Sequence, residues 1–145
     1  MFLTNHTLTG VVLSRVIDDP VLLAPAAFVS HLALDALPHF GYKGWPFRSR
    51  SWVVLATVDN LIALSIFTAV LIANPEKWLL TVTGVFFACL PDLLFLIEIA
   101  REGKPFLPKW RRFHSRIQWG ESPLGVIPEG LWAAVMVLAI RGGIR

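Results

Sequence analysis

The sequence contains very little cysteine. Cys89 is the only cysteine in 145 residues, which excludes an internal disulfide and any zinc site built on cysteine pairs. Because Cys89 lies in an apolar run, we expect it to be a packing residue. The chain also has no glycine-rich phosphate loop and no GxSxG element. Nucleotide chemistry and serine hydrolysis therefore have no support.

Charged residues are scarce as well. They make up 16% of the chain, hydrophobic residues make up 55%, and the mean hydropathy is +0.63. A soluble domain of ordinary composition carries more charge and less apolar surface than this. We therefore predict an integral membrane protein, and the length predicts a single domain that covers 1–145.

Five apolar segments predict an all-α membrane bundle. The first segment, His6–Ile17, is too short to cross a bilayer alone. The Asp18-Asp19-Pro20 stretch after it supplies an acidic N-cap and a proline at the start of the next helix. If the first two segments form a hairpin, each rises about 18 Å, and His6 returns to the level of His31. We predict about four transmembrane helices plus a short N-terminal helix that forms a hairpin with the first span. The segments are His6–Ile17, Val21–Leu37, Val53–Ala73, Trp78–Ile99 and Val126–Ile140.

The loops between these segments differ in basic charge. The 41–52 and 101–122 loops carry three and six Lys or Arg residues, whereas the 74–77 turn carries one. The positive-inside rule places the two basic loops on the cytoplasmic side of an inner or plasma membrane. The net charge of +3 comes from residues between apolar runs, so topology and lipid headgroups explain it better than nucleic acid does. The first residues, MFLTNHTLTG, have no basic region, and we do not expect a removed signal peptide.

The stretch Ser30–Tyr42 carries the most informative polar residues. Its sequence, SHLALDALPHFGY, repeats His31, Asp35 and His39 every four residues, so a helix would place them on one face, about 40° apart per step. Imidazole and carboxylate groups in apolar surroundings are costly unless they are paired or bind a metal. Neutral imidazole and ionised carboxylate are ligands that Zn²⁺ selects. The alternative is a buried His–Asp pair that only ties helices together.

Other ionisable residues are predicted at the same depth. Asp59, Asp92 and Glu129 lie toward a basic loop in their apolar segments, His114 lies in a basic loop itself, and the hairpin brings His6 to this level. Agreement in depth favours a functional site over scattered structural residues. We predict metal ligands, carboxylates that act as general base or orient a histidine, and arginines that hold a phosphate. The candidate metal ligands are His6, His31, Asp35, His39, Asp92 and His114; the candidate catalytic carboxylates are Asp59 and Glu129; the candidate phosphate ligands are Arg111, Arg112 and Arg116.

Short motifs carry a resemblance to a known family. HLALDALPH at 31–39, the Pro91-Asp92 pair and His6 in HTLTG resemble motifs of the bacterial membrane-bound metal-dependent hydrolases, and FHSR around His114 resembles a histidine–serine element of that family. The chain is more distantly similar to the helical zinc phospholipase C type, in which HxxxD on a helix binds the metal centre. In the family the HxxxD element follows Pro-Asp, whereas here it precedes it. The resemblance implies a hydrolase of phosphoester or lipid-like substrates with a divalent metal, zinc first, with manganese and iron as alternatives.

Two other functions remain open from the sequence. The same residues could pass a metal ion or a proton through the bundle, although they gather at one end and no internal repeat is detectable. A non-enzymatic membrane scaffold, in which these residues only lock helices together, is the second alternative. The sequence is compatible with one or two metal ions and leaves the oligomeric state open.

Overall fold

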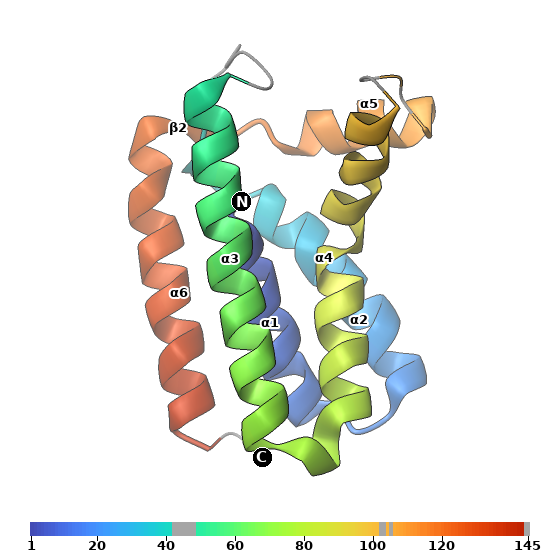
Figure 1. Ribbon diagram of the computed structural model, residues 1–145, viewed down its shortest axis with the longest axis vertical. Coiled ribbons are helices and arrows are strands. Elements are labelled where there is room, and N and C mark those ends of the chain that lie inside the picture. The colour runs from blue at the N-terminus through green and yellow to red at the C-terminus, as the bar shows by residue number, and fades with distance from the viewer. Residues whose placement is uncertain (42–48, 102–103, 105, 144–145) are drawn as a thin grey trace.

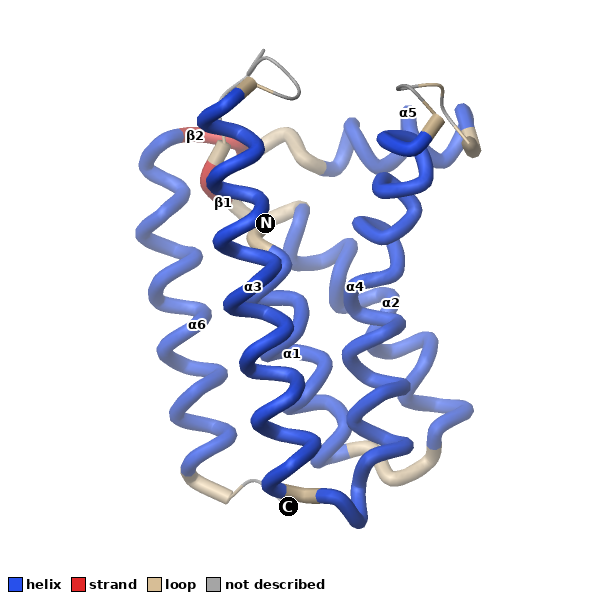
Figure 2. Tube along the Cα trace, in the orientation of Figure 1, coloured by secondary structure: helices blue, strands red, loops and turns tan. Residues whose placement is uncertain are grey.

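In a computed structural model the chain folds into a bundle of helices (Figures 1 and 2). The structure describes residues 1–41, 49–101, 104 and 106–143. Within these ranges it contains six α-helices, two 3-10 turns and one pair of two-residue strands, which confirms the predicted all-α class. The elements are α1 Leu3–Val16, α2 Pro20–Asp35, β1 His39–Phe40, α3 Arg50–Ala73, η1 Pro75–Lys77, α4 Trp78–Ala100, α5 Pro108–Ile117, β2 Glu121–Ser122, η2 Pro123–Gly125 and α6 Val126–Arg141.

Among the residues that the structure describes, three helices are long and apolar enough to cross a membrane, which indicates membrane association. They cover Arg50–Ala73, Pro75–Phe95 and Pro123–Arg141, and so correspond to α3, α4 and α6 with the turns before the last two. α2 is apolar but has only 16 residues. The predicted orientation depends in part on Lys43 and Arg48, which lie outside the described residues.

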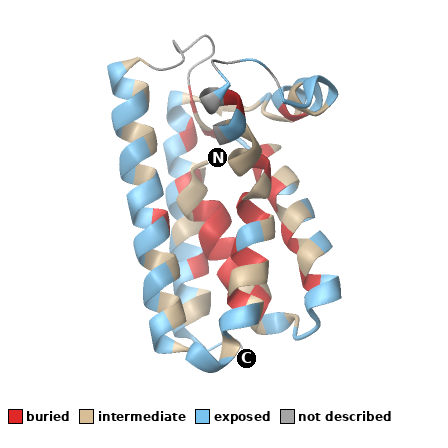
Figure 3. Ribbon diagram, turned by 45° about the vertical axis from the view of Figure 1, so that its right-hand side comes forward, coloured by how far each residue is buried: buried red, intermediate tan, exposed pale blue. Residues whose placement is uncertain are grey.

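α1 lies inside the bundle and contacts α2, α3, α4 and α6. Figure 3 shows the buried residues in the middle of the bundle and the exposed ones on its outer helices. The outer helices expose large apolar side chains such as Leu61, Leu64 and Leu131. A polar interior inside an apolar shell suits a lipid environment, because buried polar groups find partners only within the protein. The buried polar side chains of α1 are Asn5, His6, Thr7, Thr9 and Ser14.

α2 begins at a recognisable capping signal. The Asp19 side chain accepts a hydrogen bond of 2.8 Å from the Val21 N–H, and a proline occupies the first helical position, as the sequence predicts. α2 ends at Asp35, so His39 lies beyond the helix, in β1. β1 pairs in parallel with β2, with His39 opposite Glu121. This pairing joins the end of α2 to the segment between α5 and α6 (Figure 2).

α5 lies across one end of the bundle, whereas the other helices run along it (Figure 1). It follows the end of α4 in the sequence and contacts α2. α5 therefore brings a basic, aromatic segment over the same end of the bundle at which α2 finishes.

α1 and α4 cross in backbone contact at Gly10 and Gly84. A Cβ added to Gly10 would lie 2.6 Å from the Gly84 carbonyl oxygen, and a Cβ added to Gly84 would overlap the Gly10 carbonyl group. Small residues at a membrane helix crossing allow this close approach. The crossing holds α1 and α4 at a fixed distance, and both helices carry candidate metal ligands.

We expect Gly84→Ala to destabilise the bundle, because the added methyl group meets the backbone of α1 rather than a flexible side chain. Overpacking of this kind costs about 1–3 kcal/mol and should lower the midpoint of thermal unfolding in detergent. Gly130→Ala in α6 is the matched control, since no described atom lies within 4 Å of a Cβ added there. The control should be neutral or slightly stabilising. Equal stability of the two variants would contradict the close crossing.

Candidate metal centre

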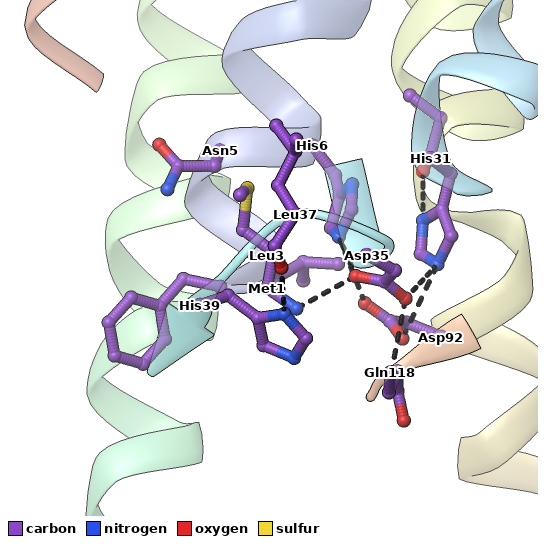
Figure 4. Close-up of polar contacts among 12 residues, drawn as sticks. Met1, Leu3, Asn5, His6, His31, Asp35, Leu37, His39, Asp92 and Gln118 are labelled. Atoms are coloured by element: carbon purple, nitrogen blue, oxygen red, sulfur yellow. Dashed lines mark hydrogen bonds and ion pairs between the residues drawn. The ribbon is translucent and has the colours of Figure 1, made fainter. Parts of the chain in front are cut away.

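Four ionisable side chains from three helices meet near one end of the bundle. His31 and Asp35 come from α2, Asp92 from α4 and His114 from α5, and one ligand atom from each lies within 4.8 Å of the others. His31 Nε2 lies 3.1 Å from Asp35 Oδ2 and 3.8 Å from Asp92 Oδ1. His114 Nε2 lies 2.7 Å from Asp35 Oδ2. We call these four residues the His/Asp cluster; Figure 4 shows three of them, with His31 and the two carboxylates turned toward one another.

Some separations in the His/Asp cluster are close to those between ligands of one metal ion, and all are within 4.8 Å. Zn²⁺ holds nitrogen and oxygen ligands at roughly 2.0–2.2 Å in a tetrahedron, so two ligand atoms on one ion stand about 3.3 Å apart. The two imidazole nitrogens, Nε2 of His31 and Nε2 of His114, are 3.3 Å apart. The His/Asp cluster could therefore hold a metal ion with small movements of its side chains.

The His31 ring is oriented by a backbone carbonyl. Its Nδ1 donates a hydrogen bond of 2.7 Å to the Ala88 carbonyl oxygen, which can only accept. In the neutral imidazole the electron pair of Nε2 then faces the carboxylates. Backbone carbonyls commonly orient metal-binding histidines in this way. Ala88 lies one helical turn before Asp92, so α4 supplies both the orienting group and a candidate ligand.

Asp35 is the buried centre of the His/Asp cluster, with 1% of its side chain exposed. Oδ2 accepts hydrogen bonds from His114 Nε2 and, at 3.2 Å, from Gln118 Nε2, while Oδ1 lies 2.7 Å from the Met1 ammonium. Burial lowers the pKa of the Met1 ammonium, but the nearby carboxylates, Asp35 first, outweigh this and hold that pKa above its usual value. The cluster is thus negative enough to stabilise a cation.

His6, from α1, adjoins the cluster without a hydrogen-bond partner. Its side chain is fully buried, and neither ring nitrogen forms a hydrogen bond to any described residue, although Nε2 lies 3.2 Å from Asp35 Oδ1. The cost of leaving a buried polar group unpaired is about 1–3 kcal/mol. Nε2 thus faces a carboxylate oxygen and Nδ1 has no partner among the described residues, an arrangement that fits a metal ligand.

One side of the His/Asp cluster is accessible. The Asp92 side chain is 32% exposed, whereas those of His31, Asp35 and His114 are at most 6% exposed. Structural zinc sites are closed by four protein ligands, whereas catalytic sites keep one position open. The exposed side of Asp92 would leave one position of a bound metal open, as a catalytic site requires.

Asp59 and Glu129, the candidate catalytic carboxylates, hold the beginning of α1. The N-cap residue of α1, Phe2, has no capping side chain. Asp59 of α3 accepts hydrogen bonds from the first two backbone N–H groups of α1. Glu129 of α6 accepts from the Phe2 N–H, the Asn5 amide and the Phe40 N–H. These contacts satisfy N–H groups that a helix start leaves free, and they position His6 one turn later. A role for either carboxylate as general base stays a prediction.

His39 lies apart from the cluster. Its Nδ1 donates to the Leu37 carbonyl oxygen at 2.8 Å, and its Nε2 lies 3.9 Å from Glu121 Oε1. The four-residue periodicity therefore joins only His31 and Asp35 on one helical face, and a ligand role for His39 stays a prediction.

The three arginines of α5 have different surroundings. Arg111 Nε lies 3.5 Å from Glu98 Oε2, and the guanidinium carbon lies 4.6 Å from the centre of the Phe95 ring. Arg112 and Arg116 are exposed. Arg111 therefore already has an internal carboxylate partner, and the two exposed arginines are better placed to meet a phosphate.

Our sequence reasoning missed three groups that contact the site: the Ala88 carbonyl, the Gln118 amide and the Met1 ammonium. Ala88 lies four residues before Asp92, and Gln118 lies four residues after His114, so the helical spacing used for His31 could have indicated both. No local signal indicates Met1, because its contact depends on how α1 packs against α2.

We expect the purified, detergent-solubilised protein to carry about one or two divalent ions per chain and Asp35→Asn to carry none. The substitution keeps the shape of the side chain but removes the charge at the centre of the His/Asp cluster. Elemental analysis measures the metal content. Asp18→Asn is the matched control, because that side chain is 83% exposed beyond the far end of α1, and it should retain the metal. Full metal content in Asp35→Asn would contradict the assignment.

No protein-family model, no curated protein and no solved structure matches this chain. The family resemblance therefore depends on the short motifs alone, and the function has to be argued from the residues of the site.

Proposed function

We propose that the protein is an integral-membrane hydrolase that uses a divalent metal at the His/Asp cluster to cleave a phosphoester in a lipid-like substrate. The observation that carries the proposal is a set of two imidazoles and two carboxylates at ligand spacing, with one carboxylate accessible. A divalent ion there would polarise a phosphoryl oxygen and lower the pKa of water to about 7. Zinc suits this mixture of nitrogen and oxygen ligands, and manganese or iron would also accept it.

The membrane arrangement supports a lipid-like substrate. We infer that α2 pairs with α1 as an antiparallel hairpin and forms a fourth, short span beside the three long apolar helices. Its 16 residues rise about 24 Å, less than the hydrocarbon core of about 30 Å, so the bilayer would thin locally around it. The cluster includes His114 of α5, the helix that crosses one end of the bundle (Figure 1), and so lies toward that end. Arg50, at the start of α3, and Arg101, just after α4, lie at this end too, so we assign it to the cytoplasmic face.

The two faces of α5 differ in character. His114 is buried against the bundle, whereas Lys109, Arg112, Phe113 and Arg116 are exposed. Basic side chains beside an exposed aromatic ring are typical of a helix at the level of lipid headgroups. Guanidinium groups match the geometry of phosphate oxygens. One helix therefore carries both a candidate metal ligand and the groups that would hold a headgroup phosphate.

Each residue of the site has a distinct role in this proposal. His31, Asp35 and His114 hold the ion from the buried side, and Asp92 binds it at the accessible side, where the phosphoester would enter. The acyl chains of the substrate would remain in the bilayer along the apolar outer helices. Asp59 and Glu129 contribute by holding α1, and thereby His6, against the other ligands.

Two observations favour a hydrolase over the alternative functions. Ion transport needs ionisable groups through the depth of the membrane, whereas the ionisable candidate ligands here come from the start of α1, the end of α2, the second half of α4 and α5. A scaffold would pair its buried polar groups internally, whereas Nδ1 of the fully buried His6 has no partner among the described residues.

We expect the zinc-loaded protein in mixed micelles to hydrolyse a phospholipid or a synthetic phosphodiester, and Asp35→Asn to be inactive. The double variant Arg112→Gln/Arg116→Gln should raise KM for an anionic phospholipid on the order of tenfold with little change in kcat, because it removes binding energy outside the reacting atoms. Lys77→Gln removes one basic side chain from the turn at the other end of the bundle; it is the control for charge away from the site and should keep the native KM. Absence of hydrolysis by the metal-loaded protein across a panel of phosphomonoesters, phosphodiesters and phospholipids would contradict the proposal.

A further inference from the structure

Each carboxylate of the His/Asp cluster presents its two oxygens to different imidazoles. Asp35 Oδ2 faces His31 and His114, whereas Asp35 Oδ1 lies 3.2 Å from His6 Nε2. Asp92 repeats the pattern, since Oδ1 lies 3.8 Å from His31 Nε2 and Oδ2 lies 4.0 Å from His6 Nε2. Two carboxylates that each face two sets of nitrogen ligands have the form of bridges between two neighbouring cations.

The stacking of two histidines separates these cation positions. The rings of His6 and His31 are 3.9 Å apart and only 19° from parallel. Figure 4 shows both rings on the same side of the Asp35 and Asp92 carboxylates, with their Nε2 atoms toward them. A metal ion lies close to the plane of the imidazole that binds it, because the nitrogen electron pair lies in that plane. Two stacked rings therefore direct their electron pairs at two adjacent points rather than at one.

Independent observations at His6 also indicate a ligand. The side chain is fully buried, and neither ring nitrogen has a hydrogen bond to the described residues. The carboxylate oxygen that faces it, Asp35 Oδ1, holds the Met1 ammonium at 2.7 Å. This position thus already stabilises one positive charge, and His6 Nε2 lies 3.2 Å from the same oxygen.

We propose a second divalent-metal site, formed by His6 Nε2, Asp35 Oδ1 and Asp92 Oδ2, beside the first. The proposal rests on the metal site of the proposed function and extends it to a two-metal centre. Ions bridged in this way stand about 3.5–4 Å apart and together bind both oxygens of an in-line phosphoryl displacement. The second ion has to displace the Met1 ammonium from Asp35, because the two positive charges would share one oxygen. We therefore expect it to bind more weakly than the first.

The net charge of the centre with two metal ions bound indicates the substrate class. Two divalent ions against two carboxylates and neutral imidazoles leave a formal charge of about +2. An anionic phosphoester offsets this charge, whereas a neutral carboxylic ester does not. Inorganic phosphate should therefore tighten binding of the second equivalent of metal and leave the first unchanged.

The test is a calorimetric titration of the metal-free, detergent-solubilised full chain with Mn²⁺, with and without inorganic phosphate. We expect two ions per chain, and one in His6→Gln with the affinity of the first site retained. Thr7→Ser is the matched control, because Thr7 is buried on the same helix and its hydroxyl contacts Cys89 rather than the cluster. This control should bind two ions.

The outcomes separate this proposal from the proposed function. One ion in the native protein, or equal stoichiometry in the native protein and His6→Gln, would overturn the second site and leave the first in place. No ion in the native protein would overturn both. If His6→Gln does not fold, paramagnetic resonance of the native protein decides the matter. Two bridged Mn²⁺ ions couple, so the second equivalent should quench the signal of the isolated ion, whereas additive signals would overturn the proposal.

Discussion

The burial of one carboxylate, that of Asp35, is the constraint on which the rest of the structure depends. An ionised carboxylate taken out of water costs several kcal/mol unless charges and hydrogen-bond donors surround it. Asp35 is surrounded by three imidazoles, one each from α1, its own helix and α5, and by the Met1 ammonium. Because these groups come from separate parts of the chain, satisfying Asp35 draws the helices together. The same concentration of ligands around one carboxylate creates a place for a cation.

The remaining polar contacts act around this centre in a consistent way. α1 has a polar buried face and no capping side chain at its start, so Asp59 and Glu129 from the outer helices satisfy its first N–H groups. The Gly10–Gly84 contact sets the distance between α1 and α4. Together these contacts hold His6 and Asp92 beside Asp35, while apolar side chains on α3 and α6 face outward. The contacts that hold the helices together thus also position the candidate ligands.

Much of this arrangement could be predicted from the sequence because it follows from local patterns. Apolar runs predict the long helices, Asp19 with Pro20 predicts the start of α2, and the four-residue spacing predicts the shared face of His31 and Asp35. The predicted depth indicates Asp92 from its apolar run, His114 from its basic loop and His6 from the hairpin, because ionisable groups in a membrane bundle gather where they can be satisfied.

The rest depends on contacts between distant segments, which local patterns do not encode. The end of α2 at Asp35 and the pairing of β1 with β2 remove His39 from the helical face. The partner of Arg111 is Glu98, a contact that depends on how α5 folds back over α4. The prediction for Asp59 and Glu129 rests on depth alone. Depth indicates that a carboxylate lies near the site, but it does not indicate which hydrogen-bond donors its oxygens contact, here the N–H groups at the start of α1.

The measurement that tests the account most directly is anomalous X-ray diffraction at the zinc edge from crystals of the zinc-loaded protein. The account predicts a strong anomalous peak inside the bundle, roughly 2.0–2.3 Å from His31 Nε2, His114 Nε2 and an oxygen of Asp35. A map with peaks only at the protein surface, and with the Asp35 carboxylate still held by histidine and the Met1 ammonium alone, would contradict it.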